Sequence, residues 1–248
     1  MLPHTQELLK KSFTLYLKNK ITILKFTGVL AIPLFITAVC KFLFTFSLDR
    51  NTPYLKLLSP ALIVFVLYVF TLWATITLVR ILSALYNRSD VNSVPKEFHA
   101  SLPLVVPSLI TIVLIACAII GGLALLILPG IIFSIWFFFS VYSVVLDGKK
   151  GTNALYFSKS LISGKWWEVL WLLGSTTFLI VGSMLIVQTI LHFLFTLLTQ
   201  FSGNGTTLTG MLNILNLIIS FVLNVLILPL SAAVPTILYN ELKKLKTS

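Results

Sequence analysis

Six long apolar stretches run through the chain, and they constrain its fold more than any other feature. They cover about residues 21–47, 58–86, 102–127, 131–147, 167–199 and 211–240. Hydrophobic residues make up 58% of the chain and charged residues only 10%, and a helix of about 20 apolar residues crosses a bilayer. We therefore predict an all-α, polytopic integral membrane bundle of six transmembrane helices, in which residues 1–248 form one integral membrane domain.

The basic residues fall mainly on one side of these stretches. Of the 18 Lys and Arg residues, only Lys41, Arg50 and Lys56 lie around the first connecting loop. The others lie in the N-terminal segment, the second and fourth loops, the adjoining span ends and the tail. The positive-inside rule then predicts that both termini are cytoplasmic. Because these charges flank apolar stretches, we assign the net charge of +11 to contact with anionic lipids, and we expect no nucleic acid partner.

Two shorter segments have the pattern of amphipathic helices that lie on a membrane surface. In residues 5–20, Leu9, Phe13, Tyr16 and Leu17 share one face and lysines share another, and residues 150–164 repeat the pattern with Ala154, Leu155, Ser158 and Leu161. We predict that both are interfacial helices on the cytoplasmic side. Their candidate lipid-headgroup contacts are Lys10, Lys11, Lys18, Lys149 and Lys150.

The fifth and sixth stretches carry uncharged polar residues at helical spacing. The candidate set consists of Gln188, His192, Asn213, Asn216 and Asn224. One interpretation is a set of hydrogen bonds between neighbouring helices, each contributing about 0.6 kcal/mol on average. The other is a polar cavity that opens to the outside, in which the histidine gains a proton near neutral pH. The second interpretation indicates a small transporter or permease subunit.

The sequence offers little material for catalysis. No Asp or Glu lies deep within a predicted span, and the three histidines, His4, His99 and His192, are scattered. Cys40 and Cys117 both fall within spans, where a cysteine usually packs as a small hydrophobic residue. We therefore expect no metal, no cofactor and no enzymatic activity.

Local patterns predict how the spans are joined and repeated. Ala118 and Gly122 are spaced for close helix approach, and Pro129 with Gly130 predicts an abrupt turn between the third and fourth spans. The second and sixth spans both end in Leu-Tyr-Asn, at 85–87 and 238–240, and the two amphipathic leads align. These matches suggest repeated helix-hairpin units, although chance similarity between Leu-rich helices is the alternative.

Residues 128–171 contain an ordered set of turn, cap and interface residues. Leu-Pro-Gly-Ile begins a span at 128–131, Asp147 and Gly148 end it, and Gly164 precedes a tryptophan pair at 166–167. This order resembles a group of six-span prokaryotic membrane proteins that includes the YciC-like family and the membrane domain of some glycerophosphodiester phosphodiesterases. The resemblance implies a bacterial or archaeal plasma-membrane protein with six helices, and we expect no phosphodiesterase activity because that catalytic portion is missing.

Together these patterns predict a non-enzymatic, multi-pass protein of the prokaryotic plasma membrane. Its role would be to interact with lipids or to organise the envelope, with the two amphipathic helices as the contact surfaces. The expected partners are membrane lipids, a second copy of the chain or other membrane proteins. The transporter with a polar site between the fifth and sixth spans is the alternative.

Overall fold

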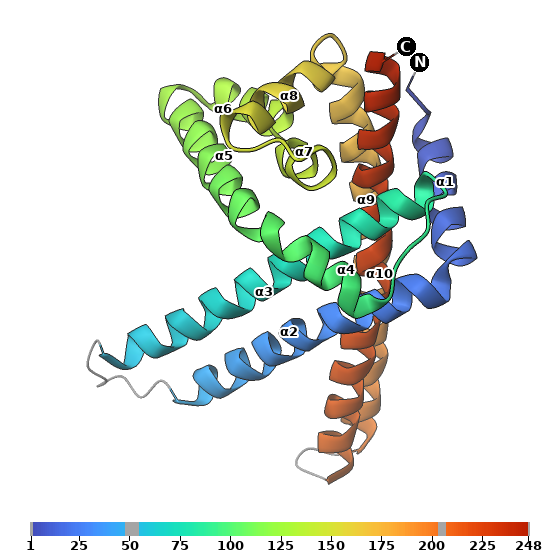
Figure 1. Ribbon diagram of the computed structural model, residues 1–248. Coiled ribbons are helices and arrows are strands. Elements are labelled where there is room, and N and C mark those ends of the chain that lie inside the picture. Colours follow the sequence, from blue (N-terminus) through green and yellow to red (C-terminus); the bar gives the residue numbers. More distant parts are fainter. Residues whose placement is uncertain (1, 48–54, 203–206, 248) are drawn as a thin grey trace.

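The computed structural model describes residues 2–47, 55–202 and 207–247, and the side chains of 2–36, 62–201 and 207–246. These residues form helices without any strand (Figure 1). In chain order the helices are α1 (Thr5–Lys18), α2 (Lys20–Ser47), α3 (Leu55–Tyr86), α4 (Val94–Ser101), the 3-10 helix η1 (Leu102–Leu104), α5 (Val105–Leu125), α6 (Ile127–Trp136), α7 (Ser140–Asp147), α8 (Thr152–Ile162), α9 (Trp166–Ser202) and α10 (Thr207–Thr247).

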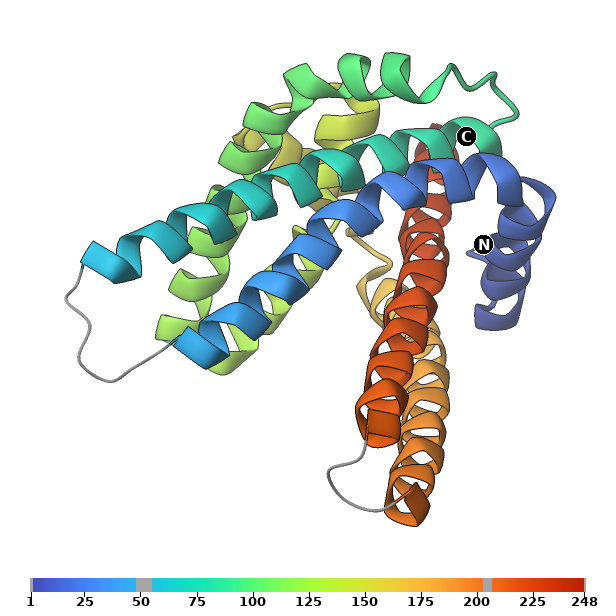
Figure 2. The same ribbon diagram turned by 90° about the horizontal axis from the view of Figure 1, so that it is seen from below.

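The order of elements repeats three times along the chain. A short helix precedes a helical hairpin in each case: α1 before α2–α3, α4 before α5 and the α6–α7 pair, and α8 before α9–α10. Figures 1 and 2 show the hairpins pointing away from a shared end of the molecule, where the start of α1 and the end of α10 lie close together. The element order therefore follows the predicted repeat, with a middle unit whose second long helix is broken.

Five helical segments are long and apolar enough to cross a membrane. They are Leu62–Tyr86, Val94–Leu125, Ile127–Asp147, Trp166–Phe201 and Thr207–Lys246. A sixth is possible if α1 and Lys20–Ile36, which meet at a bend of 90°, count as one span. The all-helical fold predicted from the sequence is thus confirmed, and the length and apolar composition of these helices are compatible with a membrane bundle. The described side chains do not include Cys40, Lys41, Arg50 or Lys56. The structure therefore describes the predicted charge asymmetry only for the lysines and arginines on the side predicted to be cytoplasmic.

The buried apolar side chains of the described residues gather at the shared end. Three clusters of buried apolar side chains form there: one joins α1, α8, α9 and α10, one joins α2, α3, α4 and α10, and one joins α3, α5 and α7. By contrast, residues 125–128 at the tip of the middle hairpin are 69–77% exposed. In the described part of the chain, the hairpins diverge away from the shared end. Their apolar side chains there face outward, which suits contact with lipid.

The α5–α6 hairpin turns through a single extended residue, Leu126, with φ −163° and ψ 155°. The predicted abrupt turn between the third and fourth spans is therefore present, but its predicted position at Pro129–Gly130 is wrong. Both residues lie in the first turn of α6, where proline costs no hydrogen bond. The predicted close approach at Gly122 is confirmed. A Cβ atom added there would lie 3.0 Å from the Cα atom of Gly130.

The fourth span is broken between α6 and α7, and α8 repairs the break. The Ser158 hydroxyl donates to the Trp136 carbonyl at 2.6 Å and accepts from the Phe139 amide at 3.1 Å. Backbone groups left without partners in a bilayer cost several kcal/mol. The face predicted to make α8 amphipathic, which includes Ala154, Ser158 and Leu161, is therefore buried against protein.

Candidate functional site

Helix α1 has three distinct faces. Leu8 and Ser12 are fully buried, with Leu8 in the cluster that includes α10. Phe13 and Leu17, on the apolar face that the sequence predicts, are 53% and 51% exposed. The third face carries the lysines. The sequence pattern missed the buried face, because it combines one leucine with a serine whose hydroxyl is satisfied by the Leu8 carbonyl at 2.9 Å.

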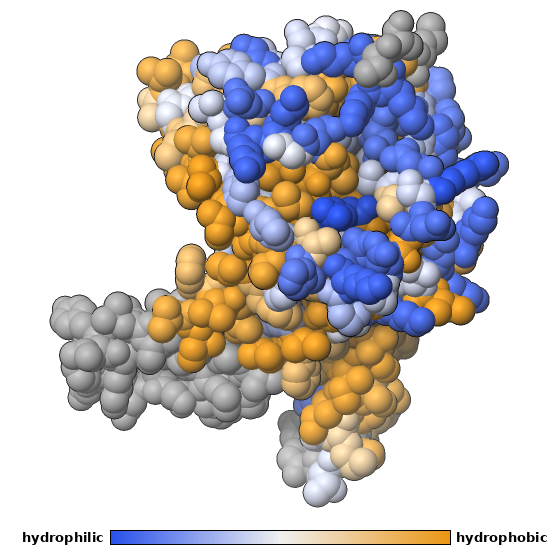
Figure 3. All heavy atoms as spheres, viewed as in Figure 1, coloured by the Kyte–Doolittle hydropathy of each residue, from blue (hydrophilic) through white to orange (hydrophobic). Residues whose placement is uncertain are grey.

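The lysine face of α1 forms one wall of a cleft of about 620 Å³, and the end of α3 forms the other. We call it the basic cleft. It is lined by Glu7, Lys10, Lys11, Thr14, Leu15, Lys18, Asn19, Leu85, Tyr86, Arg88 and Ser89. Three of the predicted headgroup contacts thus share one cleft with an arginine. Hydrophilic residues gather over this end of the molecule, and hydrophobic residues cover much of the rest of the face seen in Figure 3.

Arg88 adopts a backbone conformation that usually requires glycine. Its φ is 57°, and among the described residues it is the one non-glycine with positive φ. The amides of Ser89 and Arg88 donate to the carbonyls of Ala84 at 2.8 Å and Leu85 at 3.3 Å, which is the Schellman pattern of helix ends. The left-handed conformation costs an L-residue about 1–2 kcal/mol.

Ion pairs neutralise part of the basic cleft. The Lys11 ammonium lies 2.9 Å from the Glu7 carboxylate and 3.6 Å from that of Glu241. The hydrogen bond between Lys11 and Glu7 lowers the pKa of Glu7 and raises the pKa of Lys11. Lys10, Lys18 and Arg88 form no ion pair with the described residues. These three cations are the ones available to an anionic ligand.

The two Leu-Tyr-Asn motifs meet behind the basic cleft. The side-chain amide of Asn87 donates to the Asn240 carbonyl oxygen at 3.3 Å, and the Asn240 amide donates to the Ser83 hydroxyl at 3.1 Å. The Tyr86 hydroxyl, which lines the cleft, donates to Glu241. The ends of α3 and α10 are thereby fixed to each other, and the wall that carries Arg88 is held in place.

A second polar cluster stabilises the same end of α10. The Tyr239 hydroxyl and the Lys243 ammonium both donate to the carboxylate of Asp147, whose side chain is only 11% exposed. Asp147 is the last residue of α7, so this cluster joins the broken fourth span to the C-terminal helix. The sequence placed Asp147 at a span end but gave no sign of its partners, which lie more than 90 residues later.

Lys149 and Lys150 lie apart from the basic cleft. Both are exposed in the turn between α7 and α8. The turn is shaped by Gly148 and Gly151, with φ of 65° and 53°, and the Lys149 ammonium lies 5.6 Å from the centre of the Phe157 ring. The predicted headgroup contacts therefore divide into a cleft formed by two helices and an open turn.

The polar residues of the fifth and sixth spans lie on α9 and α10. The Asn216 amide nitrogen and His192 Nδ1 are 3.5 Å apart, so the two stripes meet across the hairpin. Asn224 donates to the Ser220 carbonyl at 2.8 Å and lines a cleft of about 410 Å³ between α2 and α10. Gln188 is half-buried, and His192, Asn213 and Asn224 are exposed. Contact between the stripes is observed, whereas the predicted shared cavity remains a prediction.

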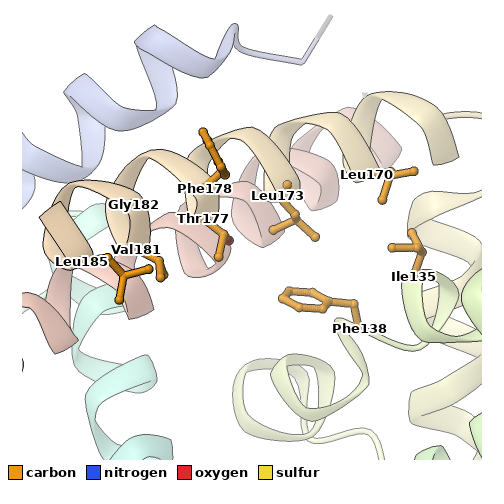
Figure 4. Close-up of a pocket in the computed structure, with 10 residues that line it drawn as sticks. Ile135, Phe138, Leu170, Leu173, Thr177, Phe178, Val181, Gly182 and Leu185 are labelled. Carbon is orange, nitrogen blue, oxygen red and sulfur yellow. The ribbon is translucent and has the colours of Figure 1, made fainter.

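Apolar clefts separate neighbouring hairpins. Figure 4 shows one of about 530 Å³, in which Ile135 and Phe138 face residues of α9 that include Leu173 and Val181. Another, of about 300 Å³ between α3 and α5, includes Trp73. Neither lining contains an ionisable side chain, so these clefts provide contacts for hydrocarbon and no acid or base.

Comparison of the chain with protein families, with curated proteins and with solved structures finds no match. The resemblance to the YciC-like group therefore stays a prediction. The clefts and their side chains are the features of this structure that carry functional chemistry.

Proposed function

We propose that this protein is a non-enzymatic, multi-pass protein of the prokaryotic plasma membrane that binds the phosphate groups of anionic lipids at its cytoplasmic end. The observation that carries the proposal is the basic cleft, where Lys10, Lys18 and Arg88 converge from two helices. Phosphate oxygens are strong acceptors for ammonium and guanidinium groups. A role in organising lipids or envelope proteins follows from this binding.

The position of α1 supports a lipid over a soluble phosphate. Its exposed Phe13 and Leu17 need an apolar environment, and a helix with such a face lies at the boundary between headgroups and acyl chains. The 90° bend between α1 and α2 places the helix across the direction of the first long helix. The lysine face of α1 is then at the depth of lipid phosphates.

The acidic groups support a non-enzymatic role, because the described pairs hold helices together. Glu97 lies 3.8 Å from Arg80 and accepts a hydrogen bond from the Asn92 side chain at 2.9 Å. Asp147 joins α7 to α10, and Glu241 joins α10 to α3. These carboxylates act as structural anchors.

Native mass spectrometry of the purified full-length protein tests the proposal. Lys10→Ala with Lys18→Ala is expected to reduce binding of phosphatidylglycerol about tenfold or more, since each basic residue near an anionic surface contributes about 1 kcal/mol. Binding of zwitterionic phosphatidylcholine should not change. The matched control is Lys96→Ala, an exposed lysine of α4 outside the cleft. Equal phosphatidylglycerol binding by the double variant and the control would exclude the basic cleft as the lipid site.

Transport is the second candidate function, and the contact between His192 and Asn216 is the observation that favours it. A transporter would use this pair as part of a polar site between α9 and α10. His192→Ala and Asn216→Ala would then change a substrate response while leaving the amount of folded protein unchanged. Loss of folded protein in both variants would instead indicate a packing role.

A further inference from the structure

We propose that the anionic ligand of the basic cleft carries two phosphates joined by a short neutral linker, as in lipids where one glycerol bridges two phosphodiesters. This inference rests on the proposed function and specifies the class of lipid that the cleft binds. The observation behind it is the placing of Lys10 and Lys18 on one wall of the cleft, with the uncharged Thr14 between them.

The charge of the basic cleft exceeds that of a single phosphodiester. Four cationic side chains and one carboxylate line it. The ion pair between Lys11 and Glu7 neutralises one of each, which leaves the cations of Lys10, Lys18 and Arg88. Like charges gathered in one cleft repel each other. A phosphodiester balances one of these cations, whereas a ligand with two phosphates balances two.

The cations of α1 stand at two separate places along the cleft. Lys10, Thr14 and Lys18 follow one another at four-residue intervals, which places them side by side on one face of the helix. At 1.5 Å per residue, the two lysines are about 12 Å apart along the helix axis. A phosphate at each lysine, with a three-carbon linker beside Thr14, spans this interval while both side chains extend outward. A single phosphate would require both side chains to bend toward each other.

The opposite wall and the size of the cleft suit the same ligand. Arg88 lies on that wall, and a guanidinium can hold a phosphate through two parallel hydrogen bonds. The cleft volume of about 620 Å³ equals that of about 20 water molecules at about 30 Å³ each. Two phosphates and the glycerol between them have fewer non-hydrogen atoms than that, so the whole bridged headgroup fits.

The surroundings of the lysines favour a lipid over a soluble diphosphate. On a helix of 3.6 residues per turn, Phe13 and Leu17 fall on the face next to Lys10, Thr14 and Lys18. Both apolar side chains are more than half exposed. The acyl chains of a lipid held in the cleft would therefore leave it over an apolar surface, which a soluble diphosphate would leave uncovered.

Native mass spectrometry of the purified full-length protein, with cardiolipin and phosphatidylglycerol at equal phosphate concentration, tests the inference. One cardiolipin should bind at least tenfold more tightly than phosphatidylglycerol, because its second phosphate contact is intramolecular. Lys10→Ala and Lys18→Ala should each lower the cardiolipin affinity to about that of phosphatidylglycerol. The matched control is Lys20→Ala, since this exposed lysine lies two residues beyond Lys18 but outside the cleft lining. Unchanged melting temperatures confirm that the variants are folded.

Four other results would contradict the inference, and they differ in what they leave standing. Equal affinities for the two lipids, both reduced in the Lys10→Ala, Lys18→Ala double variant, would overturn the two-phosphate ligand alone. Lipid binding that the double variant does not change would refute the proposed function as well. Equal losses in Lys18→Ala and Lys20→Ala would assign the binding to general surface charge. A deacylated cardiolipin headgroup that binds as tightly as cardiolipin would replace the lipid by a soluble diphosphate.

Discussion

Replacing Arg88 separates two effects that act in opposite directions, backbone strain and charge in the basic cleft. Arg88→Gly and Arg88→Ala both remove the guanidinium, but only the glycine variant relieves the positive φ of 57°. The left-handed conformation costs alanine about 1–2 kcal/mol, and the greater freedom of glycine in the unfolded chain offsets about 0.5–1 kcal/mol. We therefore expect the glycine variant to be about 0.5–1 kcal/mol more stable than the alanine variant.

Lipid binding should follow the charge alone. Arg88→Gly and Arg88→Ala are expected to weaken phosphatidylglycerol binding equally, by about fivefold for a loss of about 1 kcal/mol. Arg88→Lys keeps a positive charge and the strained backbone, so it should retain most of the binding. Its stability should match that of the original protein.

Thermal unfolding in detergent and lipid titration by native mass spectrometry provide the two measurements. The expected difference in melting temperature between the glycine and alanine variants is roughly 2 °C. The control for the backbone effect is Gly148→Ala, at the end of α7, where φ is 65° and an added Cβ meets no atom within 4 Å. That variant should lose stability without losing lipid. Equal melting temperatures for Arg88→Gly and Arg88→Ala would refute the strain argument, and unchanged lipid binding in both would refute the charge argument.

Three further substitutions probe the hairpins and the shared end. Gly130→Ala should destabilise the fold by about 1–3 kcal/mol, because its Cβ would lie 2.4 Å from a leucine of α5, whereas Gly121→Ala meets no atom within 4 Å and should be neutral in thermal unfolding. Asp147→Asn should cost about 2 kcal/mol in the same assay, since it weakens charge-assisted hydrogen bonds. Glu7→Gln should increase phosphatidylglycerol binding at neutral pH. In the original protein, phosphatidylglycerol binding should increase only as the pH falls through the lowered pKa of Glu7. Lys11 stays protonated over this range because its pKa is raised.

The coarse fold could be predicted because bilayer thickness leaves a direct mark on a sequence. Apolar length identified the long helices, and helical periodicity identified α1 and α8 near their observed bounds. Helix α4 was missed within the loop before the third span. The sequence does hold a signal for it, since Ser93 precedes Pro95 in the first helical turn. Its buried residues include Glu97 and Phe98, whose partners on the distant helix α3 are Arg80 and Trp73.

The basic cleft was only partly predictable, because it depends on contacts between distant segments. The lysines of α1 were identified because they share one helical face and precede a long apolar stretch. Arg88 was not, since arginine at a left-handed position contradicts the usual preference for glycine. Nothing in the sequence indicated that α1 would pack against α10 through Leu8 and Ser12. That packing face decides which lysines turn toward the end of α3.

The break in the fourth span has a consequence for biosynthesis, because the Ser158 hydroxyl that bridges it lies later in the chain. Trp136 and Phe139 obtain their partner from a residue about 20 positions further along the chain. Until that segment has emerged from the ribosome, the half-inserted span must keep its open carbonyl and amide in contact with water or with the insertion machinery. We therefore expect Ser158→Ala to delay membrane integration of residues 127–147 during translation, a lag that protease protection of stalled nascent chains would reveal.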